Sequence, residues 1–161
     1  MTKSKDKRKA GILAAVFAAV TLVVALVVAL VVSGGEKVVV YEANQDGATI
    51  RLTYYAKGDK VYKQTAENSM TYEALGVDSK EEAKEFFDGI MEDTSDIKGY
   101  SDVITYEDDR VIEIVTIDYN VVNIDEVKNV AGAYFEGNTS DGISLERSIK
   151  FLEEAGFKKV K

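Results

Sequence analysis

Cysteine, histidine, tryptophan and proline are all absent from this chain. Without cysteine the chain has no disulfide and no thiol nucleophile, so packing alone must stabilise its fold. Without histidine it has no imidazole base, and the loss of both residue types removes the usual ligands of zinc and copper. The sequence therefore excludes thiol and imidazole catalysis and argues against a zinc or copper site.

Positive charge is scarce after the first ten residues. The chain carries 20 Lys and Arg against 28 Asp and Glu, a formal net charge of -8. Residues 1–10 alone contribute +4, so the remaining residues carry -12. Binding to nucleic acid needs a basic surface, and this acidic remainder shows none. We expect no nucleic acid among the partners.

One apolar segment carries no charge at all. Gly11 to Val32 is a run of 22 residues whose only polar side chain is Thr21. As a helix it would be roughly 33 Å long, close to the thickness of the hydrocarbon core of a bilayer. It also exceeds the apolar region of a cleavable signal, which is about 7 to 15 residues long. We expect a transmembrane anchor or uncleaved signal, with the preceding basic residues in the cytoplasm.

This anchor divides the chain into four predicted segments. Residues 1–10 form a basic cytoplasmic tail, 11–32 the anchor, 33–36 a hinge and 37–161 an extracytoplasmic α+β domain. The last segment is long enough for one hydrophobic core and too short for two. We therefore predict a single-pass protein of the cell membrane, which contacts the membrane through its N-terminal helix and is a monomer.

Alternating and β-branched patterns predict about five strands. The predicted strands are 37–43, 48–57, 60–66, 100–106 and 110–119. Turn residues at 58–59 and at 107–109 join four of them into two hairpins. The fifth strand is apolar on both faces, so we expect it inside the sheet.

Two main helices are expected to pack on this antiparallel sheet. Ser79 and Glu82 form a capping box, in which each side chain accepts a hydrogen bond from the backbone N–H of the other residue. Apolar residues then recur at helical spacing, namely Ala83, Phe86, Phe87, Ile90 and Met91. Ser144 is the predicted cap of a last helix, which stops at Gly156. The predicted fold class is therefore α+β.

Tyrosine is abundant, and four of the nine tyrosines fall on the first hairpin or within a few residues after it. They are Tyr54, Tyr55, Tyr62 and Tyr72. Tyrosine combines a large ring with a polar hydroxyl, which suits a recognition surface. The alternative is that these rings complete the core of a domain without tryptophan. We name the four as candidate binding residues.

Acidic and hydroxyl groups offer weaker candidates. The acidic residues 107–109 could donate oxygens to calcium, but a solvated hairpin tip is the reading we favour. Glu107 paired with Asp118 could act as acid and base in a small hydrolase. Ser95 and Lys98 have the Ser-x-x-Lys spacing without the companion motifs of such hydrolases. We assign no catalytic residue, no metal site and no cofactor.

Three segments of the chain resemble a known family. They read KGDKVYKQTAENSMTYEALGVDSKEEAK at 57–84, VTIDYN at 115–120 and GISLERSIKFLEEAGFKKV at 142–160. From about Gly47 onward the sequence resembles the YehR-like bacterial lipoproteins. The resemblance implies a small extracytoplasmic α+β domain held at a membrane. It brings no catalytic residues, since the molecular function of that family is uncharacterised.

The chain departs from lipoproteins where their lipid is attached. A lipoprotein signal ends in an apolar residue, a small residue, Gly or Ala, and then the acylated Cys. This chain instead reads Val32, Ser33, Gly34 and Gly35, and glycine offers no thiol to acylate. The stretch is either a lipoprotein signal that has lost its cysteine or an ordinary flexible hinge.

These observations predict a non-catalytic binding or interaction module of the bacterial cell envelope, with an envelope protein or polymer as its partner. Two alternatives stay open at the level of sequence. One is a small envelope hydrolase that depends on carboxylates, and the other is a structural assembly protein.

Overall fold

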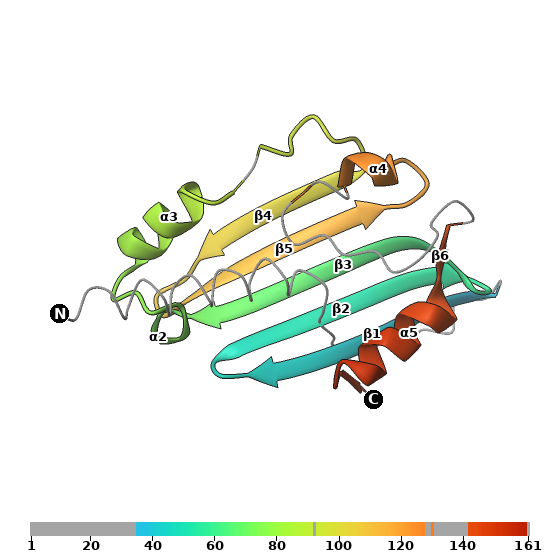
Figure 1. Cartoon of the computed structure of the whole chain (residues 1–161), viewed down its shortest axis with the longest axis horizontal. Helices are drawn as coiled ribbons and strands as arrows, with labels where there is room; N and C mark the ends of the chain where they lie inside the picture. Colours follow the sequence, from blue (N-terminus) through green and yellow to red (C-terminus); the bar gives the residue numbers. More distant parts are fainter. Residues whose placement is uncertain (1–34, 92, 128–129, 131–141, 161) are drawn as a thin grey trace.

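The computed structural model describes residues 35–91, 93–127, 130 and 142–160, and its strands form one antiparallel sheet (Figure 1). The strands are β1 (Glu36–Gln45), β2 (Ala48–Lys57), β3 (Lys60–Thr71), β4 (Tyr100–Tyr106), β5 (Arg110–Asp118), β6 (Ile143–Ser144) and β7 (Lys158–Lys159). Their order is β4-β5-β3-β2-β1-β7, and β6 pairs with the beginning of β3. Strand β5 therefore lies inside the sheet, as its apolar faces predict.

Tight turns produce the long hairpins. Gln45 pairs with Ala48, so β1 and β2 are joined by the two residues Asp46 and Gly47. Both have positive φ angles, 49° and 85°. A two-residue hairpin turn of this kind fits the twist of the strands, and Asp-Gly is among the sequences that adopt it most readily.

Four helices flank the sheet within the described residues: α2 (Tyr72–Leu75), α3 (Lys80–Asp88), α4 (Ile124–Val127) and α5 (Leu145–Glu154). Figure 1 shows α2 and α3 at one end of the sheet and α4 at the other, with α5 beside β1 and β2. The N-terminus of α5 is tied to the β2–β3 turn, because Asp59 accepts hydrogen bonds from Ser144 Oγ at 2.7 Å and from Glu146 N at 2.8 Å. These bonds also lower the pKa of Asp59.

One face of the sheet carries the core. Tyr41, Leu52, Ala66 and Val115 stand in one row across four strands, and all four are buried. Leu152 of α5 packs on the β1 and β2 side of this row. The helices therefore cover this face, which we call the covered face.

The second face is more polar. One of its cross-strand rows consists of Thr53, Thr65, Thr116 and Ser101. Among the described residues, the three apolar clusters of the core take no side chain from this face. We call it the second face throughout.

The predicted fold class is wrong in two respects. The sheet has seven strands rather than about five, because two-residue strands such as β6 and β7 leave no periodic pattern in a sequence. The predicted membrane helix is not supported, since no helix within 35–91, 93–127, 130 and 142–160 is long and apolar enough to cross a bilayer. Residues 1–10 and 11–32, for which the tail and the anchor are predicted, lie outside the described residues.

The first main helix is shorter than predicted. Helix α3 ends at Asp88, and Ile90 and Met91 are exposed beyond it rather than buried in its stripe. Its cap also differs in detail. The Ser79 hydroxyl accepts from Glu82 N as expected, but the Glu82 carboxylate accepts from Asp78 N, one residue before the predicted donor.

Candidate functional site

A β-bulge interrupts the first part of β3. Tyr55 pairs with Lys63 while Ala56 pairs with Val61, so Tyr62 is an extra residue in the ladder. A bulge of this kind bends the strand and re-aims a side chain. Val61 and Gln64 on either side are buried in the covered face, whereas Tyr62 and Lys63 between them are half-buried.

The bulge brings three side chains together on the second face. The rings of Tyr55 and Tyr62 lie 6.4 Å apart between centroids, tilted by 47°. Lys63 Nζ lies 5.3 Å from the centroid of the Tyr55 ring, within reach of a cation–π interaction. We call Tyr55, Tyr62 and Lys63 the tyrosine–lysine cluster. Regular alternation would have placed Tyr62 and Lys63 on opposite faces.

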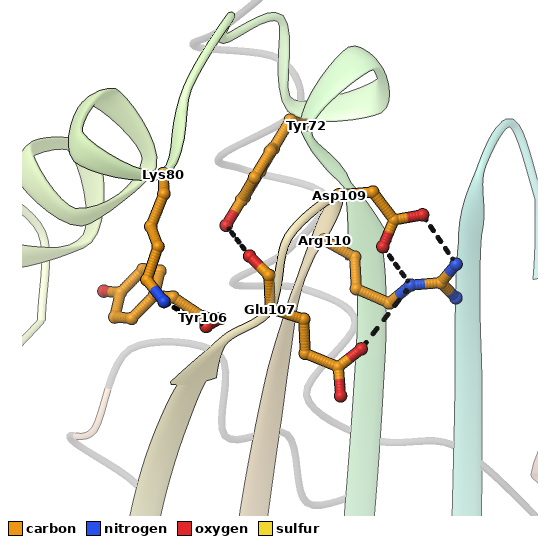
Figure 2. A network of polar contacts seen from close by, with 6 residues as sticks. All are labelled: Tyr72, Lys80, Tyr106, Glu107, Asp109 and Arg110. Atoms are coloured by element: carbon orange, nitrogen blue, oxygen red, sulfur yellow. Dashed lines mark hydrogen bonds and ion pairs between the residues drawn. The ribbon is translucent and has the colours of Figure 1, made fainter.

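The other two candidate tyrosines lie in the core. Tyr54 is 2% exposed beneath α5, and burial raises the pKa of its hydroxyl. Tyr72 is also buried, and its hydroxyl donates to the backbone oxygen of Glu107 at 2.6 Å (Figure 2). The structure therefore brings together two of the four predicted residues, and Tyr54 and Tyr72 follow the core alternative.

One arginine partly balances the charge at the acidic tip of the β4–β5 hairpin. The Arg110 guanidinium donates to both carboxylate oxygens of Asp109, at 2.8 and 2.9 Å, and lies 3.8 Å from Glu107 (Figure 2). These bonds lower the pKa of Asp109. Lys80 from α3 also donates to the backbone oxygen of Tyr106 at 2.7 Å. The tip thus uses its polar groups to lock itself to α2 and α3.

The remaining sequence candidates do not assemble. Glu107 precedes β5 and Asp118 ends it, so the two carboxylates lie at opposite ends of a strand of nine residues. Ser95 and Lys98 are both exposed, and the Ser95 N–H donates to Asp93 instead. Of the hinge, Val32, Ser33 and Gly34 lie outside the described residues. Gly35 accepts a hydrogen bond from Gly58 N at 3.4 Å.

A buried acidic pair was missed by the sequence analysis. Glu113 of β5 is only 4% exposed, and Asn68 Nδ2 donates to its carboxylate from β3. Asp102 of β4 points to the same covered face. A signal existed, since alternation places Glu113 in step with the buried Val111 and Val115.

Burial changes the protonation of this pair. Desolvation and, to a smaller extent, the nearby charge of Asp102 raise the pKa of Glu113 from 4.5 to about 7. The hydrogen bond from Asn68 acts in the opposite direction and lowers this pKa. Desolvation raises the pKa of Asp102 from 3.8 to about 6. Both carboxyl groups therefore titrate near neutral pH, whereas the pKa of Asp109 at the hairpin tip is lowered.

Relatives of the chain are bacterial proteins. A protein of Listeria monocytogenes named as an uncharacterized lipoprotein is 42% identical over 125 residues, 78% of this chain and 82% of its own length. The protein of Escherichia coli named uncharacterized lipoprotein YehR is 31% identical over 122 residues, 75% of this chain and 80% of its own.

Two solved structures share the architecture. The NMR structure of Escherichia coli YehR has a TM-score of 0.69 at 30% identity and matches 81% of this chain and 94% of its own. An NMR structure of a Streptococcus pneumoniae protein has a TM-score of 0.51 at 11% identity, over 83% and 90% of the two chains, which shows the fold alone.

These matches confirm the resemblance to the YehR-like lipoproteins. A sequence profile of the family described as "Protein of unknown function (DUF1307)" matches residues 37–158, most of the chain. The chain therefore belongs to this family of unknown function.

Proposed function

We propose that this protein is a membrane-associated, extracytoplasmic module of the bacterial cell envelope, which binds an envelope polymer or protein without transforming it. The observation that carries the proposal is the tyrosine–lysine cluster. Its two rings stand 6.4 Å apart on the polar second face, next to a lysine ammonium. A bulge that turns three such groups to one side is a feature typical of binding and active sites.

The chemistry of the cluster suits binding rather than catalysis. Tyrosine rings offer flat apolar surface at low entropic cost, and lysine offers a positive charge for an anionic ligand. The chain has no histidine or cysteine to serve as base or nucleophile. Its pair of carboxyl groups with raised pKa values lies on the covered face, away from this cluster.

The relatives support the proposed location. Proteins named lipoproteins share most of the domain with this chain, which supports the same placement outside the cytoplasm. This chain has no cysteine, so a lipid on a cysteine thiol is not its means of attachment. We propose that the segment before Gly35 provides the attachment instead. Fractionation of cells that express the full chain or residues 36–161 alone tests this, because only the full chain should sediment with membranes.

The binding proposal is tested by cosedimentation. The purified protein is mixed with insoluble cell-wall material from a bacterium, and the bound fraction is measured for the wild type and for Tyr55→Ala/Tyr62→Ala. We expect at least a tenfold loss of affinity in the double variant. Val103→Ala/Ile114→Ala is the matched control, since it removes an exposed apolar pair from the same face. Equal binding by all three proteins would reject the cluster as the site.

A further inference from the structure

Three polar side chains meet on the covered face of strands β3, β5 and β4. Asn68 stands opposite Glu113 in the β3–β5 ladder. Glu113 stands opposite Ile104 in the β4–β5 ladder, and Asp102 lies two residues before Ile104 on the same face. Asp102 is therefore the diagonal neighbour of Glu113, at a spacing that long side chains can bridge.

Two oxygen atoms of this group have no hydrogen-bond partner among the described residues. Asn68 is 1% exposed, and its amide nitrogen donates to Glu113 while its Oδ1 atom accepts no hydrogen bond from the described residues. The Oδ1 atom of Asp102 is also buried without a donor from them. Buried polar atoms are almost always hydrogen-bonded in native proteins, so two such oxygens beside a buried carboxylate require an explanation.

The part of the chain that the structure describes also provides no counter-charge for this group. None of the ion pairs formed by the described residues includes Asp102 or Glu113. The negative charge of Asp102 instead contributes to the raised pKa of Glu113. An unpaired buried charge costs several kcal/mol, and proteins normally keep buried carboxylates either paired or coordinated to a metal ion. A positive ion that accepts oxygen ligands would supply the counter-charge at a pH where both groups are ionised.

We propose that Asp102, Glu113 and Asn68 bind a hard divalent cation, with the two carboxylates and the Asn68 amide oxygen as protein ligands. Two carboxylates match the charge of a divalent ion, and oxygen-only ligands select calcium or magnesium over zinc. Water completes the coordination shell. The described residues hold no group of three acidic side chains placed to bind a metal, so the proposed site takes only two carboxylates and one amide oxygen from the chain.

Asp102 is the proposed ligand nearest to solvent. Asp102 lies on β4, the edge strand of the sheet, and is half-buried, whereas Glu113 lies one strand further in and is buried. A cation would therefore meet Asp102 first and reach Glu113 and Asn68 behind it.

The test uses the full chain, freed of metal with a chelator and then dialysed. Its thermal unfolding is followed at about pH 7.5 with increasing CaCl2 or MgCl2, and with KCl at matched ionic strength. Binding to the folded state alone raises the Tm progressively with the concentration of the ion. We expect this rise with at least one divalent salt and no rise with KCl. Equilibrium dialysis with radioactive calcium should then give one bound ion per chain. Magnesium should compete with calcium for the same site.

Two variants assign the ligands. Glu113→Gln keeps an acceptor for Asn68 and removes one charge, and Asp102→Asn removes the other. Each variant should need at least a tenfold higher ion concentration than the wild type to reach the same Tm shift. Glu107→Gln at the exposed hairpin tip is the matched control and should keep the full shift. If a variant fails to fold, dialysis of the wild-type chain still tests whether the chain binds a divalent ion.

Three results would overturn the proposal. The first is no bound ion in dialysis. The second is an equal shift in all variants, which would indicate binding elsewhere. The third is stabilisation of the wild type by acid alone, with neither divalent ion acting at about pH 7.5, because the pair would then be neutralised by protons.

Discussion

The β4–β5 hairpin contains two acidic regions that behave in opposite ways. At its tip, Asp109 and Glu107 are exposed and face the guanidinium of Arg110 (Figure 2). In its middle, Asp102 and Glu113 face the covered side without a described basic partner. The tip has a carboxyl pKa below the ordinary value, and the middle has two that are raised.

A dense cluster of acidic residues in the sequence therefore does not mark the carboxyl groups whose pKa values are raised. Three adjacent acidic residues at a turn all reach solvent, where water and one arginine satisfy them. A single glutamate among β-branched residues is carried into the covered face by the alternation of its strand. The four predictions below test this contrast, from the largest expected effect to the smallest.

The largest effect is expected from removing the amide that supports Glu113. Asn68→Leu deletes the hydrogen bond to the buried carboxylate and leaves its charge unpaired. We expect the free energy of unfolding to fall by about 4 kcal/mol at mildly alkaline pH, as for other broken buried pairs. Chemical denaturation measures it. The loss should be smaller at mildly acidic pH, because Glu113 is then protonated and carries no charge.

The next effect is a dependence of stability on pH in the presence of a chelator. The pKa values of Glu113 and Asp102 rise on folding, from 4.5 to about 7 and from 3.8 to about 6. The folded chain therefore holds these protons more tightly than the unfolded chain. Stability should be fully present below the unfolded pKa values and decline as the pH rises through 6 and 7, by about 3 kcal/mol for Glu113 alone.

The control for this profile is Glu113→Gln, which cannot titrate. Its unfolding free energy should decline less between mildly acidic and mildly alkaline pH than that of the wild type. Parallel profiles for the two proteins would show that the pH dependence arises elsewhere.

A smaller effect is expected where the tip meets α2. Tyr72→Phe removes the hydroxyl that donates to the Glu107 backbone oxygen and leaves the ring in the core. We expect a loss of about 1 kcal/mol, which is typical of one hydrogen bond. Hydrogen exchange should also become faster for amides at the tip and remain unchanged in the middle of the hairpin. Faster exchange along the whole hairpin would contradict the separation of the two regions.

The smallest effect is expected at the tip itself. Arg110→Ala removes the partner of two exposed carboxylates, which water then solvates. We expect the midpoint of chemical unfolding to stay within experimental error of the wild type, with any change disappearing at high salt. A loss as large as that of Asn68→Leu would remove the distinction between the tip and the middle.

The sequence predicted the parts of the fold that depend on local periodicity. The second strand was predicted at 48–57 and is found there, and the Ser144 cap opens α5 by accepting from Arg147 N. Short β6 and β7 were missed because two residues pair only after distant parts of the chain have met. The helix after Ser79 was extended too far, because Ile90 and Met91 continue an apolar pattern without being buried.

Tyr55 and Tyr62 of the tyrosine–lysine cluster were predicted from the sequence but Lys63 was not, because the β-bulge in β3 cannot be predicted from alternation. Simple alternation puts Tyr54 and Tyr55 on opposite faces and says nothing of which face is covered. Only the shifted register shows that Tyr62 and Lys63 both lie beside Tyr55. The acidic pair required the register between β4 and β5, which no pattern within one strand contains.

The bond between Gly58 and Gly35 has a consequence for the reach of the protein. It fixes the place where the chain enters the sheet, beside Glu36 and its partner Lys57. Tyr55 lies two residues from Lys57, roughly 7 Å along the strand. A ligand held by the tyrosine–lysine cluster would therefore lie at the same end of the sheet as Gly35, while the acidic tip of β4–β5 extends from the opposite end. Under the attachment proposed above, such a ligand would be held in the layer of the envelope nearest the membrane.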